Sequence, residues 1–181
     1  MLEEKRSLVS LIMNAKLIPS IFTLANLLLG IVSLVFTMEN EFVISSASIL
    51  FAMILDAMDG RLARRLDAAS PFGKELDSLA DLVSFGVAPA ILVYAMRMKT
   101  LGVIGLIICI AFALCGAIRL ARFNVLNIST YFVGVPITAA GSLVALIVLV
   151  GTRINIPAIV FPITMILMAF LMVSNIRIPK Y

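Results

Sequence analysis

Four aspartates fall inside or beside the most apolar parts of this 181-residue sequence. Asp56 and Asp59 are three residues apart, and Asp77 and Asp81 are four apart, so each pair lies on one face of a helix. A charged Asp at membrane depth costs on the order of 2.5–3.5 kcal/mol, and four such charges together repel one another. Because carboxylates without imidazole or thiolate ligands prefer hard ions, the pattern predicts that the two acidic faces meet around Mg²⁺, Mn²⁺ or Ca²⁺.

Other reactive side chains are scarce. The sequence contains no histidine, which excludes an imidazole base and any His-ligated zinc or haem. Cys109 and Cys115 are six residues apart and point in different directions on a helix, so we expect both to be free. Any catalysis must therefore use carboxylates, metal ions or cationic side chains.

The segments that carry these aspartates are strongly apolar. Hydrophobic residues make up 62% of the chain and charged residues 13%, against roughly 25% charged residues in soluble domains. The mean hydropathy of +1.17 leaves too little polar sequence to cover a water-soluble core. We therefore predict an all-α integral membrane protein. Six stretches approach the roughly 20 residues that a transmembrane helix needs, at about 18–38, 42–58, 75–96, 101–119, 132–150 and 155–174.

Residues 1–16 have a different pattern, in which apolar residues recur at helical spacing among polar ones. This pattern is typical of an amphipathic helix that lies in the membrane interface. No linker or internal repeat interrupts the rest of the sequence. We therefore expect one domain over 1–181, consisting of the interfacial helix and a six-helix membrane domain over 18–174.

The distribution of Lys and Arg predicts the orientation in the cell membrane. With a cytoplasmic N-terminus, eleven basic residues lie inside and three outside, a clear positive-inside bias. The inside set is Lys5, Arg6, Lys16, Arg61, Arg64, Arg65, Lys74, Arg119, Arg122, Arg177 and Lys180, and the outside set is Arg97, Lys99 and Arg153. This orientation places the aspartates at the cytoplasmic side. No run of Lys and Arg is long enough to predict nucleic-acid binding.

The aspartates belong to a longer pattern of fixed spacing. It resembles the signature of the CDP-alcohol phosphatidyltransferase family, D-x2-D-G-x2-A-R-x8-G-x3-D-x3-D, which is matched by Asp56, Asp59, Gly60, Ala63, Arg64, Gly73, Asp77 and Asp81. The resemblance implies transfer of a phosphatidyl group from a CDP-linked lipid to an alcohol, with release of CMP. It also implies a homodimer.

Two divalent cations, Mg²⁺ or Mn²⁺ with Ca²⁺ able to occupy the sites, fit this reaction. Asp56 and Asp77 would each bind both ions. Asp59 would complete the coordination of one ion, and Asp81 would lie near the other. Asp81 is also the expected general base, because no histidine can take the proton from the acceptor hydroxyl.

The same resemblance suggests contacts with the CDP-lipid. Gly60 and Gly73 would allow close approach of the nucleotide, Ala63 would keep that helix face open, and Arg64 would contact phosphate. Two further residues in the first span, Thr23 and Asn26, are expected nucleotide contacts.

The acceptor is suggested by the segments 84–89, 119–124 and 131–136, which resemble the phosphatidylserine synthase branch of the family. Serine carries a carboxylate, and the planar guanidinium of Arg122 or Arg119 suits it; Phe123 and Asn124 are further expected serine contacts. The other interpretation of both arginines is cytoplasmic anchoring. Whether the lipid has ester or ether chains stays open.

Three alternatives remain. Glycerol phosphate or inositol phosphate could be the acceptor. Membrane prenyltransferases also bind lipid diphosphates through aspartates, but they lack the element found at residues 60–64. An ion carrier would need a polar path through the last two spans, where the sequence has none.

Overall fold

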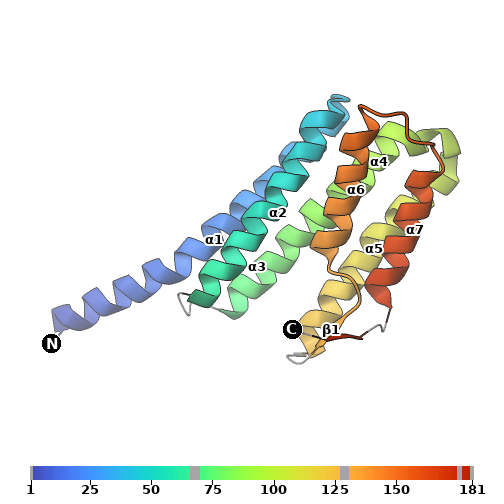
Figure 1. The fold of residues 1–181 in the computed structure, drawn as a ribbon. Helices are drawn as coiled ribbons and strands as arrows, with labels where there is room; N and C mark the ends of the chain where they lie inside the picture. The colour runs from blue at the N-terminus through green and yellow to red at the C-terminus, as the bar shows by residue number, and fades with distance from the viewer. Residues whose placement is uncertain (1, 66–69, 127–130, 175–176, 180–181) are drawn as a thin grey trace.

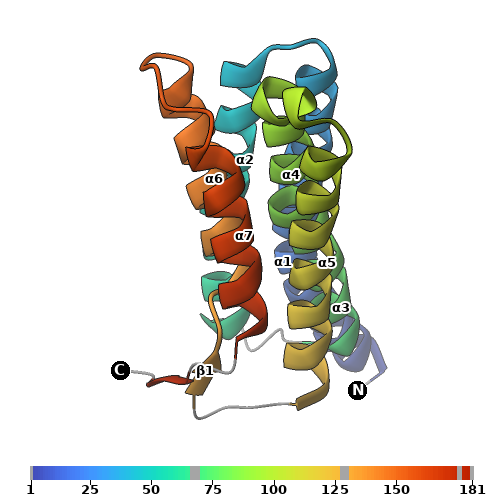
Figure 2. The ribbon, with the colours of Figure 1, turned by 90° about the vertical axis from the view of Figure 1, so that its right-hand side faces the viewer.

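A computed structural model describes residues 2–65, 70–126, 131–174 and 177–179. The helices form a bundle with their axes roughly along one direction, and the N-terminal part of the first helix projects beyond it (Figures 1 and 2). Helices account for nearly all of the described chain. The predicted helical architecture is therefore confirmed.

The first two helices, α1 (Leu2–Met38) and α2 (Phe42–Arg65), pack side by side in antiparallel fashion. A short turn joins them, in which Asn40 adopts a positive φ of 62°. The interfacial helix expected at residues 1–16 does not end before the first span but continues into it through Pro19, as one helix.

The next segment of the chain is a nearly continuous rod. It begins with α3 (Pro71–Asp81), whose first turn is capped by the Ser70 side chain. The rod then continues through the π-helical η1 (Leu82–Val87), α4 (Ala88–Val93), η2 (Tyr94–Met98) and the short η3 (Lys99–Leu101). Gly102, with a φ of 58°, reverses the chain into α5 (Gly102–Leu126).

The C-terminal part contains α6 (Ile137–Gly151) and α7 (Val160–Val173). A helix was expected from residue 132, but β1 (Tyr131–Val133) pairs antiparallel with β2 (Arg177–Pro179) and α6 starts only at Ile137. This expectation was wrong because Gly134 has a φ of 70° and Pro136 stands at the N-cap, so neither position continues a helix backwards.

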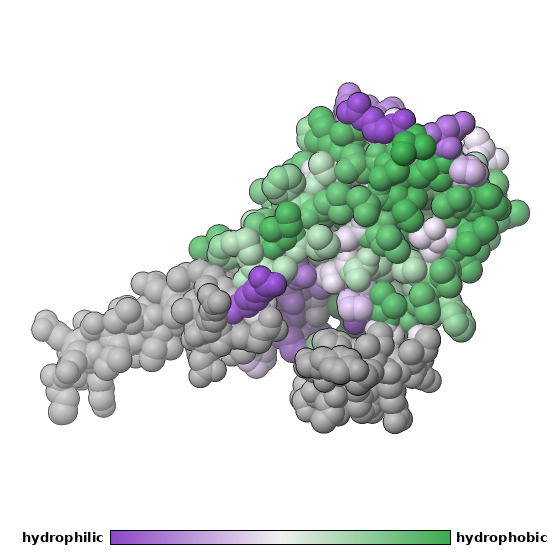
Figure 3. All heavy atoms as spheres, viewed as in Figure 1, coloured by the Kyte–Doolittle hydropathy of each residue, from purple (hydrophilic) through white to green (hydrophobic). Residues whose placement is uncertain are grey.

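Among the residues coloured in Figure 3, apolar side chains cover most of the face in view. Three helical stretches are long and apolar enough to cross a membrane, namely Ser20–Met38, Phe42–Arg61 and Pro71–Val125, and the third turns back at Gly102. Helices α6 and α7 are shorter and also apolar. Large apolar side chains such as Phe170 (69% exposed) and Ile107 (59%) point outward, as expected in lipid. The chain is therefore a helical membrane protein. Both cysteines are free, as predicted.

Two glycines let neighbouring helices approach the segment that follows the last aspartate. A Cβ atom on Gly30 of α1 would collide with Ser84 of η1. A Cβ atom on Gly141 of α6 would collide with the backbone carbonyl of Phe85. Small residues of this kind are what close helix packing in a membrane requires, so η1 is held closely from two sides.

The replacement Gly141→Ala should therefore destabilise the protein. The added methyl meets backbone, which cannot rotate away, and overpacking of this kind typically costs about 1–3 kcal/mol. We expect a lower midpoint of thermal unfolding in detergent. The matched control is Gly60→Ala, whose Cβ would meet nothing within 4 Å; an equal loss of stability in both variants would contradict the packing argument.

Candidate active site

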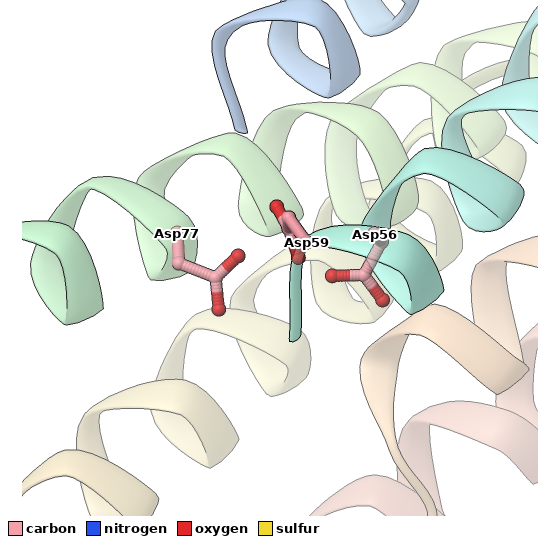
Figure 4. Close-up of side chains that lie close together, drawn as sticks. All are labelled: Asp56, Asp59 and Asp77. Atoms are coloured by element: carbon pink, nitrogen blue, oxygen red, sulfur yellow. The ribbon is translucent and has the colours of Figure 1, made fainter. Parts of the chain in front are cut away.

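Three aspartates from two helices form an acidic cluster. Asp56 and Asp59 come from α2 and Asp77 from α3, and one carboxylate oxygen of each lies within 4.8 Å of the others (Figure 4). Asp59 is only 5% exposed. The prediction that the two acidic faces meet is confirmed.

Asp81 lies one helical turn beyond Asp77 and is 8% exposed. Its carboxyl group is close enough to those of the other three aspartates to interact electrostatically with all of them. It is not part of the triad of oxygens that could share one ion. The site therefore consists of a three-carboxylate cluster with a fourth buried carboxyl group beside it.

The first helix supports these carboxyl groups with two buried side chains. Thr23 Oγ1 donates to Asp59 Oδ2 at 3.1 Å, and Asn26 Nδ2 donates to Asp81 Oδ1 at 3.4 Å. Both residues were predicted to contact the nucleotide, whereas the structure places them against the aspartates. Ser84 Oγ donates to the backbone carbonyl of Asn26 at 3.0 Å. The sequence did not reveal this partner of Ser84, although a hydroxyl in an apolar helix indicates that some partner exists.

The cluster fits a hard divalent cation. Its possible ligands are all oxygens, and their mutual spacing allows several to reach one ion. Among the described residues, Asp77 Oδ1 and Asn26 Oδ1 are buried and have no hydrogen-bond partner. Such orphaned acceptors are costly unless something binds them, which a cation or a substrate group would do.

The other predicted CDP-lipid contacts differ in their surroundings. Gly60 directly follows Asp59 and faces open space, as a nucleotide contact would require. Gly73 instead belongs to the cap of α3, since its N–H donates to Ser70 Oγ at 3.0 Å. Ala63 and Arg64 lie in the last turns of α2, but their side chains fall outside the part of the chain that the structure describes.

The two arginines predicted to bind serine lie near the C-terminal end of α5. Arg119 is half-buried and interacts electrostatically with Asp81, and its Nε has no hydrogen-bond partner among the described residues. Arg122 Nη1 donates to the carbonyl of Val173 at 2.9 Å, at the end of α7. Arg119 thus lies near the acidic site, whereas Arg122 contacts the end of α7.

Phe123 and Asn124 were also predicted to contact serine. The structure brings both against α3, with the Phe123 ring beneath Lys74 and the Asn124 amide hydrogen-bonded to Ser78 and Glu75. The sequence alone did not indicate this contact, because it depends on how α3 and α5 pack.

Comparison with known proteins identifies similar chains. A family model described as CDP-alcohol phosphatidyltransferase matches residues 16–175. A CDP-diacylglycerol–serine O-phosphatidyltransferase from Helicobacter pylori is 38% identical over 172 residues, covering 91% of this chain and 73% of the relative. Proteins of the same name from Methanocaldococcus jannaschii (40% identical over 159 residues, 88% and 72% covered) and Bacillus subtilis (36% over 165 residues, 91% and 90%) are also similar.

Proposed function

The chain belongs to the CDP-alcohol phosphatidyltransferase family, and from this premise we propose that it transfers a phosphatidyl group from a CDP-diacylglycerol-type lipid to the hydroxyl of L-serine. CMP is the second product. The observation that carries the proposal is the convergence of Asp56, Asp59 and Asp77 in a chain 36–40% identical to relatives named for this reaction.

The proposal includes an arrangement in the membrane. The rod from α3 to η3 and the helix α5 each count as one span, which together with α1, α2, α6 and α7 makes six. The positive-inside bias favours an active site on the cytoplasmic side of the cell membrane. We further propose that residues 1–181 act as one domain, that the N-terminal part of α1 lies in the membrane interface, and that the enzyme is a homodimer.

Two divalent cations, Mg²⁺ or Mn²⁺, are the proposed cofactors. Asp56, Asp59 and Asp77 would hold them, with Asp81 near one of the two. When bound, they supply positive charge that stabilises the developing charge on the diphosphate oxygens. Gly60 leaves room next to these ligands, which supports binding of the CDP group there, with Arg64 and Ala63 on the following turn.

Asp81 is the proposed general base. The serine oxygen forms a bond to the phosphorus of the phosphatidyl group, the bond from that phosphorus to the CMP oxygen breaks, and the serine hydroxyl proton passes to Asp81. The hydrogen bond from Asn26 to one carboxyl oxygen of Asp81 fixes the orientation of this base. Burial of Asp81 excludes water that would compete with serine.

Serine binds through its carboxylate to the arginines of α5. Arg119 is favoured because its Nε is buried without a partner among the described residues and it lies near Asp81. Arg122 contributes from the next turn while it also holds the end of α7. A guanidinium matches a carboxylate with two parallel hydrogen bonds.

The variant Arg119→Lys should therefore lose affinity for serine. An ammonium group cannot reproduce the paired hydrogen bonds, and loss of a charge-assisted contact of roughly 1.5–3 kcal/mol should raise KM for serine about 10- to 100-fold. KM for the CDP-lipid should barely change. If Arg122→Lys raises KM for serine more than Arg119→Lys does, then Arg122 is the main carboxylate ligand.

The function is tested by CMP release with a panel of acceptors. Purified protein in lipid–detergent micelles is given CDP-diacylglycerol with serine, serine amide, glycerol 3-phosphate or inositol phosphate. We expect turnover with serine and little with serine amide, which lacks the carboxylate. Preference for glycerol 3-phosphate or inositol phosphate would move the protein to another branch of the family. Ion flux through vesicles without CMP release would indicate a carrier instead.

A further inference from the structure

The C-terminal end of α5 and the first turns of α3 are joined by a reciprocal polar contact. Asn124 Nδ2 donates to Ser78 Oγ at 3.0 Å and approaches the two carboxylate oxygens of Glu75 at 3.4 and 3.3 Å. In the other direction, Lys74 Nζ donates to the backbone carbonyl of Asn124 at 3.3 Å. Each helix therefore both donates to and accepts from the other.

Two further contacts strengthen this connection. Ser78 Oγ donates to the backbone carbonyl of Lys74 at 3.1 Å, so the hydroxyl that accepts from Asn124 is itself fixed to α3. Lys74 Nζ lies 5.8 Å from the centre of the Phe123 ring, within the range of a cation–π interaction. We call the five residues Lys74, Glu75, Ser78, Phe123 and Asn124 the α3–α5 clamp.

The clamp surrounds a proposed metal ligand in the sequence. Asp77 directly precedes Ser78 and lies two residues after Glu75. Adjacent residues on a helix point about 100° apart, and residues two positions apart about 200°. Ser78 and Glu75 therefore hold α3 by a different face from the one on which Asp77 points toward Asp56 and Asp59. Fixing one face prevents the helix from rotating about its axis.

We propose that Asn124 is a positioning residue that sets the rotation of α3 and thereby keeps Asp77 in the acidic cluster. It acts through Ser78 and Glu75, and it does so without contacting the reacting atoms. The inference depends on the proposed function only through the role of Asp77 as a metal ligand. It replaces the expectation from the sequence that Asn124 binds serine.

The amide of Asn124 allows the two roles to be separated. Its Nδ2 donates to Ser78 of α3, whereas its Oδ1 has no hydrogen-bond partner among the described residues. Asn124→Asp keeps an acceptor oxygen, removes the donor, and places a second carboxylate opposite Glu75. A positioning role predicts severe damage from this change, whereas a serine ligand acting through Oδ1 would retain its function.

The experiment measures Mn²⁺ binding by electron paramagnetic resonance of free Mn²⁺, on the full chain in detergent. Asn124→Asp should weaken Mn²⁺ binding about 10- to 100-fold, the range typical for residues that support metal ligands, and should lower kcat with little change in KM for serine. In the double variant Glu75→Gln/Asn124→Asp, the new amide at position 75 can donate to the new carboxylate at position 124. This variant should recover most of the Mn²⁺ affinity. Glu75→Gln alone should lose less than Asn124→Asp, because its amide oxygen still accepts from Asn124.

Several results would overturn the inference. Wild-type Mn²⁺ affinity in Asn124→Asp would refute the positioning role, whatever the KM for serine. Failure of the double variant to recover Mn²⁺ binding would show that the loss does not come from the clamp. Asn155→Ala, at an exposed position between α6 and α7, is the control and should behave as wild type. Absence of CMP release by the wild type would refute the proposed function while leaving the Mn²⁺ comparison valid.

Discussion

Replacing Asp77 by Asn should abolish phosphatidyl transfer and weaken divalent-metal binding together. Asp77 is the contribution of α3 to the acidic cluster, and one of its oxygens is buried without a partner among the described residues. An amide of the same shape has no charge and a single acceptor oxygen, so it cannot replace a carboxylate that two cations share. We expect a loss of kcat greater than the 10- to 100-fold typical of residues that only support ligands, together with weaker Mn²⁺ binding by calorimetric titration.

The matched control for this change is Glu41→Gln, an exposed carboxylate in the turn between α1 and α2. It lies at the other end of the bundle and should keep both activity and Mn²⁺ binding. Chelation of the wild type by EDTA should stop turnover, and added Mg²⁺ or Mn²⁺ should restore it. Full activity after exhaustive chelation, or Mn²⁺ affinity unchanged in Asp77→Asn, would contradict the metal assignment.

The second large effect is expected at Asp81, which should be needed for chemistry more than for binding. Asp81→Asn keeps the shape of the side chain next to Asn26 but cannot accept the serine proton. The loss of a general base should lower kcat by on the order of 10² to 10⁴, while the CDP-lipid still binds. Stopped-reaction assays of CMP release and equilibrium binding of CDP-diacylglycerol measure the two effects separately.

A different outcome would assign Asp81 another role. If Asp81→Asn loses CDP-lipid and Mn²⁺ binding as strongly as Asp77→Asn, the residue is a metal ligand and not the base. Asn26→Ala provides a further comparison, because it removes the hydrogen bond to Asp81 and leaves the carboxyl group in place. It should reduce kcat less than Asp81→Asn does.

The acidic cluster could be predicted from the sequence because it depends on local spacing. Residues three or four apart share a helix face whatever the tertiary structure, so Asp56 with Asp59 and Asp77 with Asp81 were sufficient to predict two acidic faces. The high cost of burying these charges in an apolar segment then required the faces to meet. The helical membrane fold followed from hydropathy for the same reason, since each apolar stretch carries its own signal.

Contacts between distant segments could not be predicted in this way. Asn26 and Asp81 are 55 residues apart, and Asn124 and Ser78 are 46 apart. A polar residue in an apolar helix indicates that some partner exists, but the identity of the partner depends on helix packing. The hydrogen bond from Arg122 to the end of α7 and the pairing of β1 with β2 were missed for the same reason.

Incorporation of labelled serine into lipid shows whether the protein makes phosphatidylserine. Wild-type protein in vesicles containing CDP-diacylglycerol is supplied with labelled L-serine and Mn²⁺, and labelled lipid and CMP are counted in the same samples. We expect one labelled phosphatidylserine for each CMP released, with neither product formed after EDTA treatment or by Asp77→Asn. CMP release without labelled lipid, or labelled lipid formed at full rate by Asp77→Asn, would contradict this expectation.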